Sequence, residues 1–390
     1  MLIGIIGAPN KGKSTLFSAL TMNDVAIADY PFTTIKPNLG VAYATRPCVH
    51  IELGVACNAR NSLCVNGTRF FPINIMDVAG LVEGAHEGCG MGNQFLNDLS
   101  SAESLIIVVD ASGKTDPSGN KSSGSNPVDD VRMVQSELIR WLSGVIGKHM
   151  NTISKRDDGV EALHEVLAGF KVTESDIERA ASSAYLSTSR ISWSEESIEK
   201  FSAALLQSAK PSLIAANKSD AQGTDANIAA LQKEFGADRV VPCSGAVELA
   251  LRKAAKLKLI DYAPGARSFA WLDKDASKER EEALKYMQAF LKSKGTNVQE
   301  LINKAAFDLL DNIVVYPVED ENKYTDHFGN VLPDGLLIRR GSTALDLAAR
   351  IHTEIAKRML YAVDARRKTR LGKDYVLKES DVIRIVSAAK

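Results

Sequence analysis

A turn rich in glycine and lysine follows only six residues into the chain. It reads GAPNKGKST (Gly7–Thr15) and fits G-x-x-x-x-G-K-[ST]. A buried-looking run, Leu2–Ile6, precedes it and an apolar helical run follows, which is the context this pattern requires. Glycines let backbone N–H groups surround phosphate oxygens, and a helix N-terminus favours an anion. The residues expected to contact a nucleoside triphosphate are Gly7, Asn10, Lys11, Gly12, Lys13, Ser14 and Thr15.

Within this loop, two side chains have separate expected roles. Lys13 supplies a positive charge toward the β- and γ-phosphates, and Ser14 offers an oxygen to Mg²⁺. A chance match on a glycine-rich turn is the alternative, and the strand–turn–helix context argues against it.

A second motif predicts which base is bound. NKSD (Asn217–Asp220) ends a predicted strand. The Asp220 carboxylate can accept from the N1–H and the exocyclic amine of guanine, and a ligand without that N1–H loses the pair. Lys218 is expected to cover the ring, and Asn217 to join the base to the phosphate loop. Downstream, a backbone amide near Ser244 and Gly245 is expected to reach the guanine carbonyl. We therefore predict GTP and GDP rather than ATP.

Two further segments are expected to respond to the γ-phosphate. DVAG (Asp77–Gly80) follows the run Ile73–Met76, so Asp77 is placed for water-bridged Mg²⁺ and Gly80 for an amide contact. Upstream, one threonine of the pair Thr33 and Thr34 is expected to bind Mg²⁺ and γ-phosphate, and to release after hydrolysis. Both strings are common alone, and their order relative to the phosphate loop gives them weight.

Composition indicates a globular protein of two or three domains. The chain has 390 residues, 45% of them hydrophobic, and a formal net charge of −1. No apolar run approaches the roughly 20 residues of a membrane helix, and the first residues lack the basic start of a signal peptide. We therefore expect a cytoplasmic protein that does not enter the membrane.

Five cysteines, an odd number, argue against a disulfide framework. Four potential metal ligands, Cys48, His50, Cys57 and Cys64, lie close together in the sequence. Their spacing matches no strong zinc signature. Two interpretations stay open: a zinc site, or reduced thiols on a long hairpin.

The element pattern predicts an α/β fold with a doubly wound, mostly parallel sheet. The apolar runs Leu2–Ile6, Leu105–Val109 and Leu213–Ala216 each precede a polar motif, as ligand-binding strands do. Val41–Thr45 and Phe71–Met76 are expected to pair as antiparallel strands. Next come an expected mobile loop (112–126) and a helical block (127–209).

The tail changes character and predicts a small α+β domain. Expected strands are Asn312–Val318, Gly335–Arg339, Tyr375–Leu377 and Val382–Val386. Thr343 to Asp346 predicts a capping box, and the helix that it opens is expected to bury Leu345, Ala348, Ile351 and Ile355. We predict a G domain over residues 1–265, interrupted by the loop and helical insertion 112–209, then a helical connector 266–311 and a C-terminal domain 312–390.

Taken together, these motifs resemble the Obg-related translation-factor GTPases, and most closely the archaeal and eukaryotic branch of the YchF-like group. The resembling segments are Gly7–Thr15, Tyr30–Gly40, Asp77–Leu96, Asn217–Asp220 and Val314–Asp320 (VVYPVED). The resemblance implies a C-terminal TGS domain with a ubiquitin-like β-grasp fold, and association with ribosomes or RNA. It also favours Thr34 over Thr33 as the Mg²⁺ ligand.

The resemblance leaves open how hydrolysis is activated. Many small GTPases carry a water-orienting Gln after the D-x-x-G glycine, whereas Leu81 stands here, as in similar proteins. Asn10 lies where similar GTPases hold K⁺ against the phosphates, and such a cation could replace an arginine finger. His86 could approach the γ-phosphate, although a surface loop residue is the favoured interpretation. We expect slow turnover, raised by K⁺ or a ribosomal partner.

Three functions are weighed. The leading hypothesis is a GTPase switch on ribosomes or RNA, which the basic run from Arg366 to Lys373 would contact if it is not simply solvated. The second is a nucleotide-dependent binding module with little hydrolysis, favoured by Leu81, and the third is a P-loop kinase, against which NKSD argues. YchF-like relatives with Glu at the NKSD aspartate tend to accept ATP, and Asp220 disfavours this.

Overall fold

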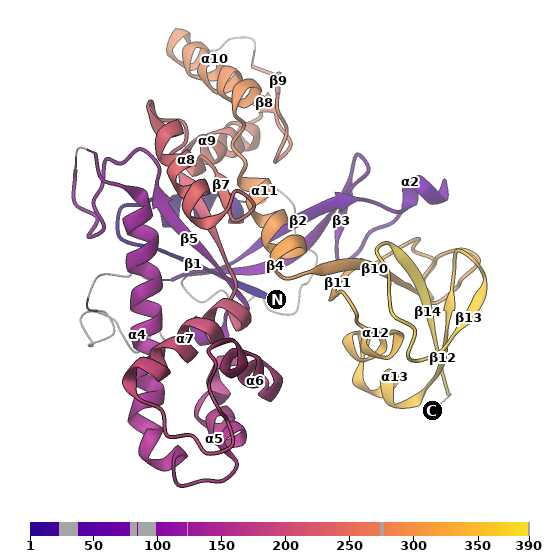
Figure 1. Cartoon of the computed structure of the whole chain (residues 1–390). Coiled ribbons are helices and arrows are strands. Elements are labelled where there is room, and N and C mark those ends of the chain that lie inside the picture. The colour runs from indigo at the N-terminus through magenta and orange to yellow at the C-terminus, as the bar shows by residue number, and fades with distance from the viewer. Residues whose placement is uncertain (23–37, 79–83, 85–98, 123, 274–276, 389–390) are drawn as a thin grey trace. The chain divides into compact units, whose positions relative to one another are not determined.

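The computed structural model describes residues 1–22, 38–78, 84, 99–122, 124–273 and 277–388 (Figure 1). The chain divides into two compact units. Unit 1 comprises Met1–Asp24, Lys36–Ala42 and Asn74–Leu301, and unit 2 comprises Val25–Ile35, Tyr43–Ile73 and Ile302–Lys390. Each unit is described by itself below. The domain boundaries drawn on the sequence stay a prediction.

A parallel sheet forms the centre of unit 1. Its strands are β1 (Leu2–Ile6), β5 (Ser104–Asp110), β6 (Ser212–Asn217) and β7 (Val240–Pro242), with the end of β4 (Thr68–Asp77) beside β1. These strands are almost wholly buried because helices cover them, which explains their apolar runs. The three parallel strands predicted from the sequence are confirmed. The registers pair Ile5 with Asp77 and Asp110 with Asn217, which brings the polar motifs to one edge.

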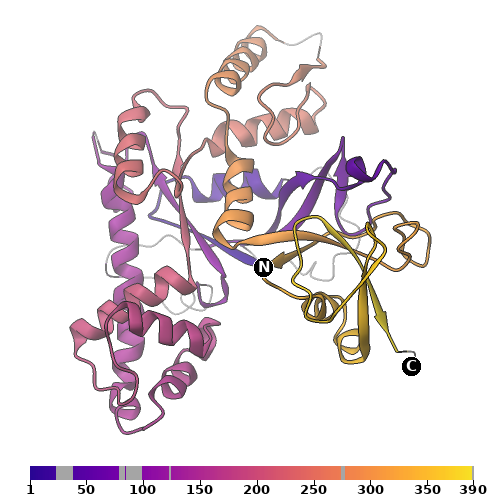
Figure 2. The ribbon, with the colours of Figure 1, turned by 45° about the vertical axis from the view of Figure 1, so that its right-hand side comes forward.

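Helices surround this sheet, and a helical insertion follows β5. The insertion begins with α4 (Pro127–Ile153), whose Asn126 side chain accepts from the Val128 amide at 3.1 Å and so caps the helix. Both views show α5, α6 and α7 gathered along one end of α4 (Figures 1 and 2). The other elements of unit 1 are α1 (Lys13–Thr21), α5 (Gly159–Val166), η2 (Ala168–Phe170), α6 (Glu174–Ser183), α7 (Glu195–Ala209), α8 (Thr224–Phe235), α9 (Gly245–Lys256), β8 (Ile260–Asp261), β9 (Ala270–Trp271) and α10 (Lys278–Ser293); α11 (Val298–Asn303) crosses into unit 2.

Unit 2 contains the tip of a long hairpin and the C-terminal domain. The hairpin comprises β2 (Leu39–Pro47), α2 (His50–Leu53), β3 (Leu63–Val65) and β4, and β2 and β4 are neighbours in the sheet, as the sequence predicts. The C-terminal sheet has the order β11-β10-β14-β12-β13, with β10 and β14 parallel at its centre. Its elements are η3 (Lys304–Leu309), β10 (Asn312–Val318), β11 (Leu336–Arg339), α12 (Ala344–Ile351), α13 (Thr353–Arg358), β12 (Met359–Asp364), β13 (Thr369–Leu371) and β14 (Asp381–Ser387).

The C-terminal domain confirms some expectations and corrects others. The capping box forms: the Thr343 and Asp346 side chains bond each other's backbone amides. The predicted strand Tyr375–Leu377 is wrong, because only an isolated bridge joins Val376 to Thr343. Strands β12 and β13 went unpredicted. Residues Met359–Asp364 form β12 because they pair with β14, which lies further along the chain, more than because of their own strand preferences.

The predicted apolar face of the capped helix is also partly wrong. Leu345 and Ile351 are each 39% exposed, whereas Ala344, Leu347 and Ala348 are buried. The helix ends at Ile351, and extended backbone at His352 separates it from α13. Both misassigned residues lie within α12 itself, where the buried face follows Ala344, Leu347 and Ala348, while Ile355, beyond the break, does pack against the core.

None of the helices in the described ranges combines the length and the hydrophobicity of a bilayer-spanning segment.

Candidate nucleotide-binding site

The backbone of the phosphate loop takes a shape that glycine makes possible. Gly7 has φ 145° and Gly12 has φ 90°, conformations that side chains disfavour. A Cβ on Gly7 would lie 2.4 Å from the Val108 carbonyl oxygen, and one on Gly12 would lie 2.4 Å from Nδ2 of Asn217. At these two positions the loop therefore packs directly on β5 and on the NKSD motif, which only residues without a Cβ allow.

Helix α1 begins where the loop ends, at Lys13. The residue before it, Gly12, has no side chain, so none caps the helix. The first amides of a helix have no intrahelical acceptor and carry the positive end of its dipole. The start of α1 is therefore built to receive an anion such as a phosphate.

Lys13 is buried at the same place. Its Nζ donates to the Ala8 carbonyl oxygen at 2.8 Å. Burial lowers the pKa of Lys13, the Asp77 carboxylate acts in the opposite direction, and Lys11 lowers it further. A buried ammonium near other positive groups gains when an anion binds beside it. Lys13 can thus stabilise phosphate charge more strongly than a solvated lysine would.

Asn217 connects the phosphate loop to the segment after β7. Its Nδ2 donates to the Lys11 carbonyl oxygen at 3.0 Å, and its Oδ1 accepts from the Gly245 amide at 3.0 Å. The side chain is 3% exposed, so both hydrogen bonds are shielded from water. One residue therefore fixes the spacing between the two places where phosphates and base are expected.

Lys218 lies across the same edge of the sheet in a left-handed backbone conformation, φ 62°. Its Nζ donates to the Asn10 carbonyl oxygen at 3.0 Å and to Oδ2 of Asp110 at 2.8 Å. Burial raises the pKa of Asp110, but hydrogen bonds from Lys218, Ser112 and Thr115 outweigh it and hold the pKa below its usual value. Asp110 therefore stays ionised and holds the Lys218 ammonium, so the aliphatic part of this side chain can line a base.

Asp220 is oriented by Ser244. The Ser244 hydroxyl donates to Oδ1 of Asp220 at 2.6 Å and accepts from the Val247 amide at 3.2 Å, capping α9. The Tyr286 hydroxyl donates to the backbone carbonyl of Asp220 at 3.2 Å. Because Ser244 uses only one lone pair of Oδ1, both oxygens of the Asp220 carboxylate can still accept hydrogen bonds from a ligand with two donors.

Three family models match the chain. One described as a 50S ribosome-binding GTPase matches residues 2–143, the G4 motif-containing domain of Obg-like GTPases (YGR210-like) matches residues 215–320, and the TGS domain matches residues 328–387. An uncharacterized GTP-binding protein of Methanocaldococcus jannaschii is 48% identical, with 100% of both chains covered. The chain belongs to the Obg-related, YchF-like GTP-binding proteins.

Solved structures agree with this membership. A GTP binding protein from Pyrococcus horikoshii OT3 is 37% identical, covers 100% of both chains and gives a TM-score of 0.80. The YchF GTPase of Schizosaccharomyces pombe, 20% identical, shares the fold over 99% of this chain and 97% of its own, with a TM-score of 0.60. The predicted P-loop G domain with a C-terminal TGS domain is therefore confirmed.

In this GTP-binding protein, most of the predicted nucleotide contacts meet at one edge of the sheet. Asp77 is fixed there by β4, and its amide donates to the Asn38 carbonyl oxygen at 2.9 Å. Ser14 is exposed in the first turn of α1. Thr33, Thr34, Gly80, Leu81 and His86 lie outside the described residues.

Two phosphate-loop side chains are directed away from the loop. Lys11 is fully buried, donates to the Thr115 hydroxyl at 3.0 Å and to the Asp116 carbonyl oxygen at 2.7 Å, and lies 2.8 Å from Oδ2 of Asp130. Its contact with a nucleotide is therefore limited to its backbone. Asn10 donates through Nδ2 to the Gly119 carbonyl oxygen at 2.9 Å. Its role in holding K⁺ stays a prediction.

The segment after β5 was the main feature that sequence reasoning missed at this site. Ser, Gly and Asn residues suggested a mobile loop, yet residues 112–122 are hydrogen-bonded internally and to Asn10 and Lys11. How mobile the segment is stays a prediction. Asp110 is a polar residue at the end of a buried strand, and this position was the sequence signal that could have predicted its contact with Lys218.

Proposed function

We propose that this protein hydrolyses GTP to GDP and phosphate and uses the reaction as a conformational switch. The observation that carries the proposal is the double hydrogen bond of Asn217, which joins the phosphate loop to the Asp220 and Ser244 segment at a fixed spacing. The loop supplies amides and Lys13 for phosphates, and Asp220 supplies an acceptor for guanine. Membership of a GTP-binding family supports the same assignment.

The proposed metal is Mg²⁺. The Ser14 hydroxyl and the Asp77 carboxylate are hard oxygen donors of the kind this ion prefers. Asp77 lies near enough to Lys13 to influence its pKa, so the donors fit a metal bound next to phosphates. Thr34 is the third proposed ligand. When bound, Mg²⁺ would neutralise phosphate charge, while Lys13 stabilises charge that develops on the transferred group.

Activation of the attacking water is proposed to differ from that in GTPases with a Gln after the D-x-x-G glycine. Leu81 stands at that position and cannot orient water. We propose K⁺ beside Asn10 as an electrostatic aid and assign Gly80 an amide contact with the γ-phosphate. His86 is a weaker candidate for the γ-phosphate. Faster GTP turnover in potassium than in sodium is expected, and equal rates would count against the role of Asn10.

A guanine-specific titration tests the proposal. Calorimetry with Mg²⁺ should show GDP and GTP binding, with ATP at least about a hundredfold weaker because it lacks the N1–H donor. The Asp220→Asn variant should weaken GTP binding at least about tenfold. Its matched control is Asp225→Asn, which removes only an exposed ion pair with Lys294. Equal affinity for GTP and ATP would overturn the guanine assignment.

A second candidate function is a nucleotide-dependent binding module that scarcely hydrolyses GTP, or an NTPase that also accepts ATP. The apolar Leu81 favours the first, whereas Asp220 disfavours the second. Phosphate release with and without ribosomes separates the switch from the binding module. If GTP binds but its hydrolysis stays at the background rate both with and without ribosomes, the result would favour the binding module.

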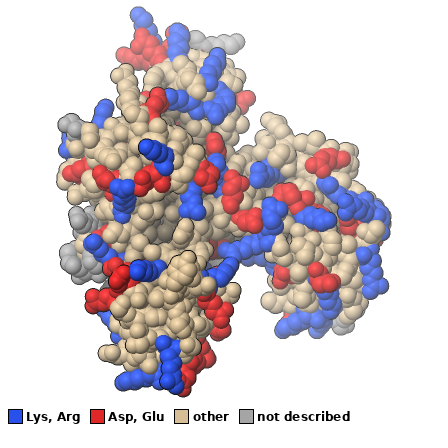
Figure 3. Space-filling view, viewed as in Figure 1, with Lys and Arg blue, Asp and Glu red and all other residues tan. Residues whose placement is uncertain are grey.

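We propose a ribosome or RNA as the partner, in the cytoplasm. Support comes from the 50S ribosome-binding GTPase model and from basic residues on the C-terminal domain. Lys and Arg side chains gather over the part that carries β12 to β14 (Figure 3).

The basic run 366–373 is partly neutralised by its neighbours. Arg366 pairs with Glu52 and Arg367 with Asp364, while Arg370 covers the Tyr361 ring. Within the described residues, Lys368, Arg370 and Lys373 form no ion pair with a carboxylate and could meet phosphates.

A further inference from the structure

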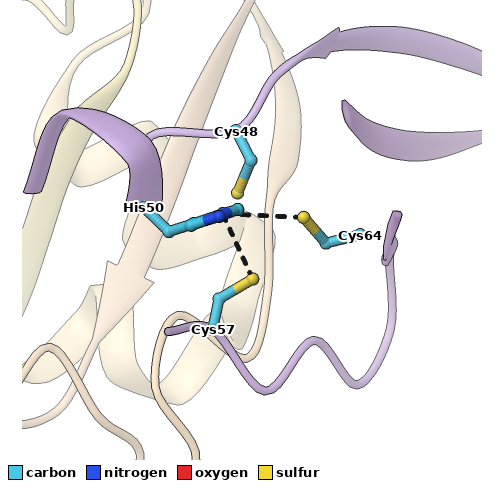
Figure 4. Close-up of side chains that lie close together, drawn as sticks. All are labelled: Cys48, His50, Cys57 and Cys64. Atoms are coloured by element: carbon cyan, nitrogen blue, oxygen red, sulfur yellow. Dashed lines mark hydrogen bonds between the residues drawn. The ribbon is translucent and has the colours of Figure 1, made fainter. Parts of the chain in front are cut away.

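Three thiols and one imidazole converge at the tip of the hairpin in unit 2. We name Cys48, His50, Cys57 and Cys64 the Cys–His cluster. Their ligand atoms all lie within 4.8 Å of one another, although the residues come from four different places along the hairpin (Figure 4). Cys48 follows β2, His50 begins α2, Cys57 lies in the next loop and Cys64 belongs to β3. The fold thus brings together donors that the sequence spacing leaves unconnected.

The distances suit a shared ion better than hydrogen bonds between thiols and imidazole. Nδ1 of His50 lies 3.4 Å from Sγ of Cys57 and 3.6 Å from Sγ of Cys64. A tetrahedral zinc ion with Zn–S bonds of about 2.3 Å and Zn–N bonds of about 2.0 Å places sulfur and nitrogen about 3.5 Å apart. Nδ1 either donates one hydrogen bond through its N–H or, when unprotonated, accepts one along its lone pair, so it cannot satisfy two thiols at this range.

A buried cation beside the cluster points in the same direction. Arg69 is fully buried, and its Nη1 lies 4.0 Å from Sγ of Cys48. Its other acceptors are neutral: the Ser62 hydroxyl and the carbonyl oxygens of Leu332 and Pro333. Among the described residues, no carboxylate forms an ion pair with Arg69.

The charge of the loaded cluster completes this environment. A buried charge without a counter-charge is costly. Three thiolates and one neutral imidazole around a dication carry one net negative charge. A zinc-loaded cluster would therefore supply the counter-charge that Arg69 lacks.

The loop that carries the ligands also contacts the C-terminal domain. The Asn58 amide donates to the Val331 carbonyl oxygen at 2.8 Å, and the Arg60 amide donates to that of Pro333 at 2.8 Å. The Asn61 side chain bonds Asp334. These contacts lie between Cys57 and Cys64, so fixing both cysteines would also fix the contacts.

We propose that Cys48, His50, Cys57 and Cys64 bind one zinc ion, which holds the 48–64 loop against residues 331–334 of the C-terminal domain. Soft thiolates with one imidazole select zinc among the common divalent ions. Four protein ligands leave no open position, so the ion is structural and not catalytic. Unlike Mg²⁺, this metal is independent of the nucleotide.

Metal content of the full-length, reduced protein tests the site. One zinc per chain is expected after dialysis, measured by plasma mass spectrometry, and added Co²⁺ should give the visible absorption of a tetrahedral thiolate complex. His50→Ala and Cys57→Ala should lose the metal, while His50→Cys, which restores four ligands, should keep it. The controls Cys243→Ala and His149→Ala remove a thiol and an imidazole elsewhere and should keep one zinc. Wild-type protein that binds neither zinc nor cobalt would overturn the proposal, even if the alanine variants fail to fold.

Hydrogen exchange tests the consequence for the loop. Removing zinc with a chelator should speed exchange of the Asn58 and Arg60 amides at least about tenfold, because the loop that carries these amides would no longer be held against the Val331 and Pro333 carbonyls. The amides of β6, in unit 1, serve as the internal control and should not change. Bound zinc whose removal leaves the Asn58 and Arg60 amides unchanged would refute the holding role.

Discussion

The substitution Asn217→Ala should damage both stability and nucleotide binding. The side chain is 3% exposed and satisfies two backbone groups, the Lys11 carbonyl and the Gly245 amide. Each buried group left without a partner costs about 1–3 kcal/mol, so the free energy of unfolding should fall by about 2–6 kcal/mol. Since folded domains are stable by only about 5–15 kcal/mol, this loss is large.

Binding should weaken for a separate reason. Without Asn217, the phosphate loop and the Ser244–Gly245 segment are no longer held at one spacing, so GDP must order them when it binds. If about 1.4–2.8 kcal/mol of the loss is transferred to binding, the Kd for GDP rises about tenfold to a hundredfold. Urea denaturation measures the stability, and calorimetry under conditions where the variant is folded measures the Kd.

A matched variant gives the comparison. Asn227→Ala removes one partly buried hydrogen bond to the Ala111 carbonyl, at 2.9 Å, without touching the phosphate loop. It should cost about 0.5–1.5 kcal/mol and leave the Kd for GDP unchanged. If Asn217→Ala loses no more stability than this control and binds GDP as the wild type does, the reasoning about Asn217 is wrong.

Three further outcomes are expected. Gly12→Ala should abolish GDP binding in calorimetry, because its Cβ would lie 2.4 Å from Nδ2 of Asn217 at φ 90°; retained affinity would contradict the close packing of the loop. Burial and then the nearby Lys171 lower the pKa of Lys210 to about 8, against the opposing charge of Glu103. The unfolded chain therefore binds more protons between that value and the ordinary lysine pKa of 10.5, and the free energy of unfolding should rise by about 2 kcal/mol from about pH 7.5 to 9.5. Urea titrations at both pH values should show this rise in the wild type and lose it in Lys210→Met. Replacing Lys368, Arg370 and Lys373 with glutamine should weaken ribosome or RNA binding and flatten its salt dependence in sedimentation assays, and unchanged binding would remove this surface as a contact.

Local patterns predicted the parallel strands and the phosphate loop because each depends on neighbouring residues. Leu2–Ile6 is apolar because both of its faces are covered, and the glycines after it permit one particular turn. Features that depend on distant partners were harder to predict. The strand β12 is defined by pairing with β14, and the side chain of Lys11 is directed by Thr115 and Asp130, more than a hundred residues away.

The Cys–His cluster illustrates the same limit. Its four residues were visible in the sequence, but their spacing could not decide between a zinc site and free thiols. The distances around His50 depend on how α2, the following loop and β3 fold back on β2. No spacing rule for a single loop describes ligands gathered in this way.

The burial of Lys11 has a practical consequence for anyone who trims this protein. Its ammonium is enclosed by Thr115, Asp116 and Asp130, all of which belong to the stretch between β5 and the first turns of α4. Excising residues 112–209 to obtain a minimal nucleotide-binding fragment would remove these partners, and the phosphate loop would lose the contacts that fix its Lys11 side chain. The smallest fragment that retains an intact phosphate loop must therefore include the start of the helical insertion, because residues there contact and position the loop.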